Sequence, residues 1–380
     1  MRDDDDAKTL LQRAMAMPMG DARLDTLRRA VDIADEDGQL ALAFQARQEL
    51  IETANFLDLD DVVLVEFAWC RQQMRKSPEH FQAFVDEYLW IYKWVINGAL
   101  HSFAGISQEQ IEALLDDMEH DYRFFDRSLR PVWKLRSDAA REFNDEEAAK
   151  AYDEKYLAAP STDLDDCEAC ECHSQVTTAI GQWEFEKAIE IAEPIIDGRL
   201  KCQTVPLNTF TQLIVPLIHL ERFDLARTLA RRGHRIAKHK HAHALHSHRF
   251  IYLWVRLKEW ETAIELLEEQ APLVTPQADP YRRLEFWGAA TALMEGLRRA
   301  GHRSVEIRLP ESWEGYRADG VYDPESLRDW FESQADQLIQ QLDARHDEPK
   351  YESKKTYWMQ LALGDSPDPD TEDCEPASGH

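Results

Sequence analysis

A seven-residue pattern that recurs through the middle of the chain constrains the fold more than any other feature. Residues 220–226 read Leu, two polar residues, an aromatic residue, two further residues and Ala, and residues 257–263 repeat this order. Two weaker copies lie upstream at residues 143–149 and 180–188, and the second of them contains two extra residues. The final alanines follow one another at spacings of 39, 38 and 37 residues. A near-constant period in this range predicts helical hairpins that stack side by side.

Apolar residues elsewhere in the chain also recur with the period of a helix. Leu24, Leu27, Val31 and Ala34, for example, fall at intervals of three and four, as on one face of an amphipathic helix. The 14 glycines among 380 residues are about half of the usual rate, and a sheet-rich fold with many tight turns would need more. We therefore predict an all-α protein: an α-solenoid of helical hairpins with an N-terminal helical bundle and a C-terminal capping helix.

Changes in this pattern divide the chain into four predicted parts. Residues 1–136 form an N-terminal helical bundle or divergent repeats, and the many aromatic residues of 81–104 favour a buried central helix over an exposed aromatic groove. Residues 137–301 form the hairpin repeats. Residues 302–363 form a C-terminal cap with a short extended segment and a helix, and residues 364–380 form a disordered acidic tail.

The repeated turn resembles that of the tetratricopeptide-repeat family, whose helix–turn–helix unit joins its helices through a Leu-Gly-x-aromatic-x-x-Ala sequence. In that family the aromatic residue packs on the hairpin and the alanine lets the second helix approach closely. Gly181 supplies the family's glycine, whereas Glu221 and Lys258 replace it in the two clearest copies. The resemblance covers residues 138–301 and implies a fold of tetratricopeptide-like hairpins. The chain is also similar to bacterial repeat proteins of unassigned function, around residues 166–170 and 343–345.

The charge of the chain excludes some classes of partner. Acidic residues outnumber basic ones 72 to 44, which gives a net charge of −28. Such a surface repels nucleic acid and anionic membranes, because both are bound mainly through Lys and Arg. The first residues do not resemble a secretory signal, and no run approaches the roughly 18 apolar residues of a membrane span. We therefore expect a cytoplasmic protein whose cysteines are reduced.

A group of cysteines is the best candidate for chemistry. Cys167 and Cys170 form a C-x-x-C pair, which is half of a familiar zinc site, and Cys202 follows about one hairpin later. A chain that runs up one helix and back along the next would return Cys202 to its starting point. Zinc held by these three and by Cys172 or His173 would then join the ends of the hairpin. Ordinary buried thiols and a redox switch are the alternatives.

Six histidines fall between residues 234 and 248. His239, His243 and His246 share one face of a helix, a spacing that can bind a metal. The stretch can equally form a polar surface that contacts a ligand, or plain solvated surface. Because histidine titrates near neutral pH, binding through this region would depend on pH.

These features together predict a scaffold or adaptor that binds a protein or peptide. Stacked hairpins expose a concave groove, and side chains of the inner helices would hold an extended peptide or a helix there. The candidate contacts are Gln175, Asn208, Gln212, His246, Arg249 and Tyr252. Arg249 and the histidines favour an acidic segment or a C-terminal carboxylate as ligand.

Two other functions remain open at this point. Intracellular peptide-sensing regulators share the plan of a helical bundle before such repeats, and a metal-dependent enzyme would use the cysteines with the nearby histidines. No glycine-rich phosphate loop, G-x-S-x-G, H-E-x-x-H or calcium-loop motif occurs in the chain. We therefore expect no catalytic activity.

Overall fold

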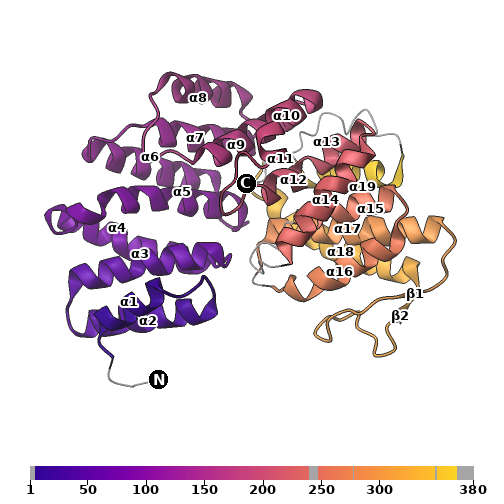
Figure 1. Ribbon diagram of the computed structural model, residues 1–380, viewed down its shortest axis with the longest axis horizontal. Coiled ribbons are helices and arrows are strands. Elements are labelled where there is room, and N and C mark those ends of the chain that lie inside the picture. The colour runs from indigo at the N-terminus through magenta and orange to yellow at the C-terminus, as the bar shows by residue number, and fades with distance from the viewer. Residues whose placement is uncertain (1–4, 239–246, 277, 347–348, 366–380) are drawn as a thin grey trace. The chain divides into compact units, whose positions relative to one another are not determined.

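The computed structural model describes residues 5–238, 247–276, 278–346 and 349–365, and these are predominantly helical (Figure 1). The predicted all-α class is confirmed. The described residues form two compact units, which divide between Asp165 and Asp166. Residues 138–165, which the sequence pattern groups with the repeats, therefore lie in the first unit. Most of the predicted acidic tail and His246 lie outside the described residues.

The first unit consists of helices that follow one another in chain order from α1 and α2 to α8 (Figure 1). Its elements are α1 (Ala7–Met15), α2 (Asp21–Glu36), α3 (Leu40–Phe56), α4 (Asp60–Lys76), η1 (Pro78–His80), η2 (Gln82–Phe84), α5 (Val85–His101), α6 (Gln108–Phe124), α7 (Arg130–Glu142) and α8 (Glu146–Ala158). Each helix from α1 to α8 packs against the next one in the chain. The predicted buried aromatic helix is confirmed as α5, in which Tyr88 and Tyr92 are fully buried and donate hydrogen bonds to Asp121 on α6.

Most of the described helical segments of the second unit form four pairs, and one further helix follows them. Its elements are α9 (Glu168–Gly181), α10 (Phe185–Ile191), α11 (Glu193–Ile196), α12 (Leu207–Gln212), α13 (Ile214–His219), α14 (Phe223–Ala237), α15 (Arg249–Arg256), α16 (Trp260–Gln270), η4 (Ala271–Leu273), α17 (Pro280–Arg299), β1 (Val305–Glu306), β2 (Val321–Tyr322), α18 (Pro324–Asp343) and α19 (Tyr351–Leu363).

The pairs of the second unit are α9 with α10, α12 and α13 with α14, α15 with α16, and α17 with α18. The first helices of neighbouring pairs also pack together, because α13 contacts α15 and α15 contacts α17. The predicted short extended segment corresponds to β1, which pairs antiparallel with β2. The predicted helix after it is α18, and the side chain of Asp323 caps its first turn by accepting a hydrogen bond from the N–H of Ser326.

Four of the turns between paired helices share one backbone feature that the sequence pattern only partly reveals. In each of these four, a residue other than glycine has a left-handed backbone, and a fully buried alanine follows five positions later. These pairs are Asn144 and Ala149, Trp183 and Ala188, Glu221 and Ala226, and Lys258 and Ala263. The longer connection from α17 to α18 lacks this feature and has Gly301 in the left-handed region instead. The first unit repeats the spacing with Gly38 and Ala43. One kind of joint therefore serves both units.

The hydrogen bonds at these joints explain why the left-handed residue is needed. At Lys258, its own N–H donates to the carbonyl of Val255 at 3.0 Å, and the N–H of Glu259 donates to the carbonyl of Trp254 at 2.9 Å. This is the Schellman motif, which satisfies the last free carbonyls of a helix and reverses the chain. The alanine that follows is fully buried, so a larger side chain there would separate the two helices.

The structure corrects the alignment of one copy of the repeat. Gly181 does not take the left-handed position that the family's glycine implies, since it is the last residue of α9. Trp183 takes that position with φ of 59°, and Phe185 is the aromatic residue that corresponds to Phe223 and Trp260. Counted in this way, the copy has no extra residues. The sequence alignment was wrong because it took Trp183, two positions before Phe185, as the aromatic residue of the turn.

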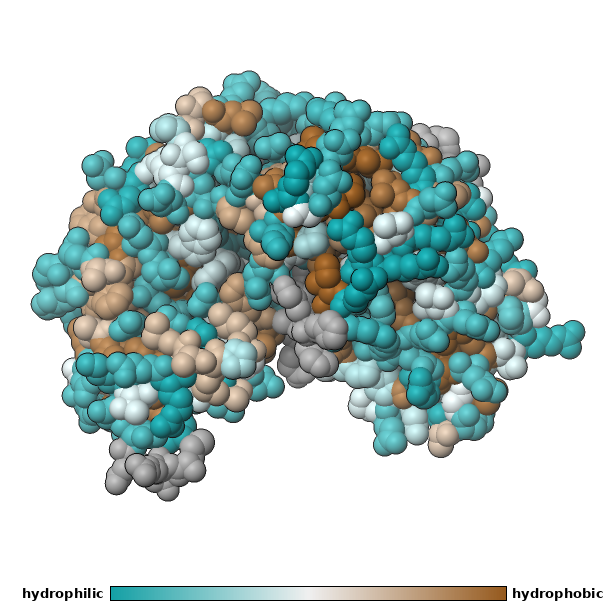
Figure 2. Space-filling view, viewed as in Figure 1, coloured by the Kyte–Doolittle hydropathy of each residue, from teal (hydrophilic) through white to brown (hydrophobic). Residues whose placement is uncertain are grey.

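The surface of both units is largely hydrophilic on the face seen in Figure 2, as the high content of charged residues predicts. Smaller apolar areas interrupt it. Among the described residues, no helix combines the length and the apolar character that crossing a membrane requires.

Replacing Lys258 by glycine is expected to stabilise the second unit by about 0.5–1 kcal/mol. A left-handed backbone costs an L-residue roughly 1–2 kcal/mol, and glycine avoids this cost. Part of the resulting stabilisation is lost, because glycine makes the unfolded chain more flexible. Urea unfolding of the full chain measures the change. Glu265→Gly, at an exposed position within α16, is the matched control and should destabilise by about 0.5–1 kcal/mol. Destabilisation by both variants would contradict this account of the joint.

Candidate functional site

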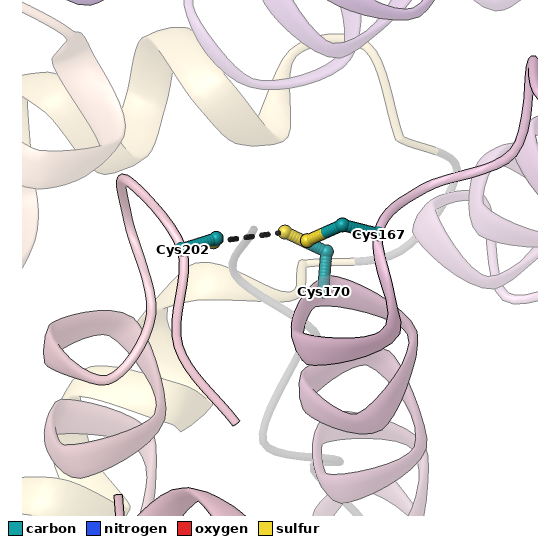
Figure 3. Close-up of side chains that lie close together, drawn as sticks. All are labelled: Cys167, Cys170 and Cys202. Carbon is teal, nitrogen blue, oxygen red and sulfur yellow. Dashed lines mark hydrogen bonds between the residues drawn. The ribbon is translucent and has the colours of Figure 1, made fainter. Parts of the chain in front are cut away.

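Three of the predicted cysteine ligands meet at the beginning of α9. Cys167 is the residue before the helix, Cys170 lies in its first turn, and Cys202 comes from the loop between α11 and α12. Figure 3 shows the side chains of Cys167 and Cys170 directed from the start of α9 towards Cys202 on the facing loop. The three sulfur atoms lie within 4.8 Å of one another. This group is able to hold a metal ion.

The loop that carries Cys202 is held in a narrow turn. The N–H of Cys202 donates to the carbonyl of Val205 at 3.0 Å, and the N–H of Val205 donates to the sulfur of Cys202 at 3.4 Å. The hydroxyl of Thr204 lies 3.6 Å from the same sulfur. Because α10 and α11 bring the chain back to the level at which α9 begins, this turn faces the C-x-x-C pair. The convergence expected from the hairpin period is thus present.

The surroundings of Cys202 favour its thiolate form. The Sγ atoms of Cys170 and Cys202 are 3.4 Å apart, so one thiol can donate a hydrogen bond to the other sulfur. This bond and the donors of the turn lower the pKa of Cys202. The same bond, together with burial, raises the pKa of Cys170. Thiolate is the form that binds metals.

Neither of the two predicted alternatives for a fourth ligand joins the cluster. Cys172 donates a hydrogen bond to the carbonyl of Ile191 at 3.3 Å, and the Nδ1 atom of buried His173 lies 3.0 Å from the hydroxyl of Thr209. Helix geometry explains the outcome for Cys172. It follows Cys170 by two positions, which rotates its side chain by about 200° around the helix axis.

The residues predicted to contact a partner have different environments. Gln175 is exposed on α9, whereas Asn208 and Gln212 on α12 and Arg249 and Tyr252 on α15 are buried. His246 lies outside the described residues. A shared binding surface would require all of these side chains to be accessible, and among the described ones only Gln175 is exposed. Arg249 and Tyr252 are buried because they contact another part of the same chain.

Arg249 belongs to a buried network of charges. Its guanidinium group donates to Gln212 and, at 2.5 Å, to Glu285 on α17. The Nε2 atom of His248 lies 2.5 Å from the other oxygen of Glu285. Burial opposes ionisation of Glu285, but the charges and hydrogen bonds of Arg249 and His248 outweigh it and lower the pKa of Glu285 to about 2. Sequence reasoning identified Arg249 and missed its counter-ion Glu285.

Helix α19 covers this network, and the sequence analysis did not single it out. The guanidinium carbon of Arg249 lies 4.9 Å from the ring centre of Trp358, and the rings of Tyr252 and Trp358 are 5.9 Å apart. The predicted contact residues of α15 therefore touch a segment of their own chain. Seven of its 13 residues are buried on several sides, so α19 has no single apolar stripe that would have revealed it.

Comparisons with protein-family models, with curated proteins and with solved structures find no match to this chain. Its function is therefore inferred from its own residues.

Replacing Glu285 by glutamine is expected to destabilise the second unit by about 3 kcal/mol at pH 7, because it leaves Arg249 buried without its counter-ion. Since the folded state lowers the pKa of Glu285, its contribution is complete above the unfolded pKa of about 4.3 and is lost as the pH falls towards 2. The difference between the wild type and Glu285→Gln should therefore shrink below about pH 4.3. Urea unfolding across this pH range measures it.

Glu295, on the same helix, provides a matched control. Hydrogen bonds from Arg298 and neighbouring arginines lower its pKa to about 2 as well. Its partners lie nearer to solvent, where water screens the ion pairs, so Glu295→Gln should destabilise the unit less. If Glu285→Gln and Glu295→Gln lowered the free energy of unfolding equally, burial of the network around Glu285 would not add to its effect on stability.

Proposed function

We propose that Cys167, Cys170 and Cys202 bind a zinc ion, and that this ion stabilises a tetratricopeptide-like protein that binds other proteins in the cytoplasm. The observation that supports the metal most strongly is that three sulfur atoms lie within 4.8 Å of one another, although Cys170 and Cys202 are 32 residues apart in the chain.

Zinc is the metal that suits these ligands. Thiolate sulfur is a soft donor, whereas Mg²⁺ and Ca²⁺ take oxygen ligands. Tetrahedral Zn²⁺ with Zn–S distances of about 2.3 Å places its sulfur ligands about 3.8 Å apart. This value lies between the 3.4 Å that separates the sulfur atoms of Cys170 and Cys202 and the upper limit of 4.8 Å for the three sulfur atoms. Small side-chain adjustments would complete the geometry.

The alternative of ordinary packed thiols fits Cys70 better than it fits this group. Cys70 is fully buried in the core of the first unit, and burial raises the pKa of its thiol. Cys167, in contrast, is exposed, and Cys170 and Cys202 are only partly buried. Their sulfur atoms add little to the apolar core. Their convergence is better explained by a shared ligand than by packing.

A structural role for the ion follows from where it would lie. It would link the beginning of α9 to the loop before α12, and so close the first hairpin of the second unit. Closing a loop of about this length removes conformational freedom from the unfolded chain, and metal-binding energy then becomes folding energy. The three cysteines leave one position of a tetrahedral site for water or another ligand. The competing proposal, a metal-dependent enzyme, would use that position for a reactive water.

The wild-type chain, purified without a histidine tag, is expected to contain one zinc ion. Cys202→Ser should weaken zinc binding at least 100-fold, because it removes one of three thiolates. Cys172→Ser should retain the ion, since that sulfur contacts the carbonyl of Ile191 instead. Elemental analysis and competition with a chromogenic chelator measure both.

Chelation separates the structural from the enzymatic proposal. We expect a chelator to lower the melting temperature of the second unit in the wild type. The same chelator should not change the melting temperature of Cys202→Ser. An ion that exchanges freely with no effect on melting would favour the enzyme. The proposed zinc site would be refuted if the wild type contained no stoichiometric metal. It would also be refuted if Cys172→Ser and Cys202→Ser weakened zinc binding equally.

Protein binding is the wider function that we propose, with a peptide-sensing regulator as one form of it. Support comes from the first helices of neighbouring pairs, α13, α15 and α17, which contact one another in series. Beneath α19 these helices carry Arg249, Tyr252 and Tyr281, and residues of these types are enriched at protein interfaces.

A further inference from the structure

The last described helix lies across the helices to which a partner would bind. Helix α19 contacts α13, α15 and α17, and also α18. In Figure 1, α19 appears in yellow beside α13 and α15. We call the surface of α13, α15 and α17 beneath this helix the α19 face. It is the surface for which the sequence predicts a peptide or helix as ligand.

Aromatic side chains anchor α19 at two places. Trp358 lies against Arg249 and Tyr252 of α15, as described above. Tyr357 approaches α13, where its hydroxyl lies 3.4 Å from the Nδ1 atom of His219. Tryptophan, tyrosine and arginine are the residues that most often dominate the affinity of protein interfaces. The contact thus has the composition of a recognition surface.

Two adjacent lysines complete the contact. Lys354 is buried and places its ammonium group 4.5 Å from the ring centre of Tyr281 on α17. Lys355, also buried, forms an ion pair of 2.7 Å with Asp336 on α18. Lysine is rarely this buried in a protein core, and both stems here cover apolar surface while the charged groups find partners.

The contact beneath α19 leaves space and polar atoms that the described part of the chain does not fill. Beneath α19, a cavity about the size of one water molecule lies between Tyr252, Gly288 and Lys354. The buried hydroxyl of Tyr252 and the indole N–H of Trp358 have no hydrogen-bond partner among the described residues. Such a contact is weaker than a core of equal area.

We propose that α19 is an internal ligand of the α19 face, and that the external partner is a helical segment of another protein with the same chemistry. That segment carries adjacent lysines followed within one turn by an aromatic pair. This inference rests on the proposed protein-binding function and specifies its partner. Binding of the partner displaces α19, so α19 limits access to the face.

The charges favour a basic segment over the acidic one that Arg249 suggested. Glu285 already neutralises Arg249, so Arg249 is not available to an incoming carboxylate. Asp336 at the edge of the face accepts a lysine of α19. The net charge of −28 also attracts cationic segments at long range. We therefore propose a basic ligand for this face in place of the acidic one that the sequence favours.

Competition within one chain sets the expected affinities. A segment tethered near its site acts at an effective concentration of about millimolar, so it excludes an external segment of equal intrinsic affinity. A peptide with the sequence of residues 349–364 should therefore bind the wild type weakly. Weakening the internal contact should strengthen binding of the same peptide.

The test uses the full chain with Trp358→Ala, which removes the anchor of α19 on α15. A fluorescent peptide of residues 349–364 should bind this variant at least ten-fold more tightly than it binds the wild type, as measured by anisotropy. Trp313→Ala is the matched control, since Trp313 packs against Trp287 and Trp330 and does not belong to the α19 face. It should not increase peptide binding.

Two further measurements keep the proposal falsifiable if Trp358→Ala disturbs folding. A peptide in which Lys354 and Lys355 are replaced by glutamate should not bind any variant. In the wild type, hydrogen exchange should be at least ten-fold faster in α19 than in α15 and α17, because α19 opens by itself. Equal protection of the three helices would show that α19 is a fixed part of the core.

The outcomes also distinguish this inference from the function on which it rests. If the peptide does not bind Trp358→Ala, or if Trp313→Ala binds it equally, α19 is not a ligand of this face. A purified partner that binds the chain without competition from the peptide would leave the protein-binding function intact and overturn only the role of α19. Loss of zinc binding has no bearing on either result.

Discussion

The structure depends on the tight joint that ends one helix and begins its partner. A residue with a left-handed backbone reverses the chain, two hydrogen bonds close the end of the first helix, and a fully buried alanine follows five positions later. Four helix pairs start from this geometry, whereas α17 and α18 pack together across a longer connection. Because the joint fixes the length of each return path, it also decides which residues of successive helices lie at the same level.

The convergence of the three cysteines is a direct result of that geometry. The joint at Trp183 sends the chain back along α10 and α11, and the loop with Cys202 then reaches the level of Cys167. Cys202 is distant from the C-x-x-C pair in the chain, and none of the three thiols is fully buried. Their proximity comes from the length of one hairpin, which is why a zinc ion at this place would report on the folding of the whole hairpin.

Sequence periodicity predicted the elements better than the details between them. Ala226 and Ala263 were recognisable because close helix packing demands a small residue, and small residues can be read from a sequence. The left-handed residues were not recognisable, because the side chains of Glu221, Lys258 and Trp183 do not indicate a left-handed backbone. Glycine usually indicates such a position, but Gly181 belongs to α9 instead.

The candidate site shows the same division between what a sequence reveals and what it hides. Cys167, Cys170 and Cys202 followed from helix and hairpin periods, whereas only the rotation of α9 excluded Cys172. Arg249 was visible as a charge on a predicted inner helix. Its partner Glu285 and its cover Trp358 come from later parts of the chain, and no local pattern connects them to Arg249.

The position of α19 in the chain has a consequence for synthesis. The 51 residues between the end of α17 and the beginning of α19 must be translated after the α19 face is complete. At about 5–20 residues per second, this takes roughly 3–10 seconds. During that interval the nascent protein presents its aromatic and charged face uncovered. A cognate segment that is already present in the cell would meet this face before the chain's own helix has left the ribosome.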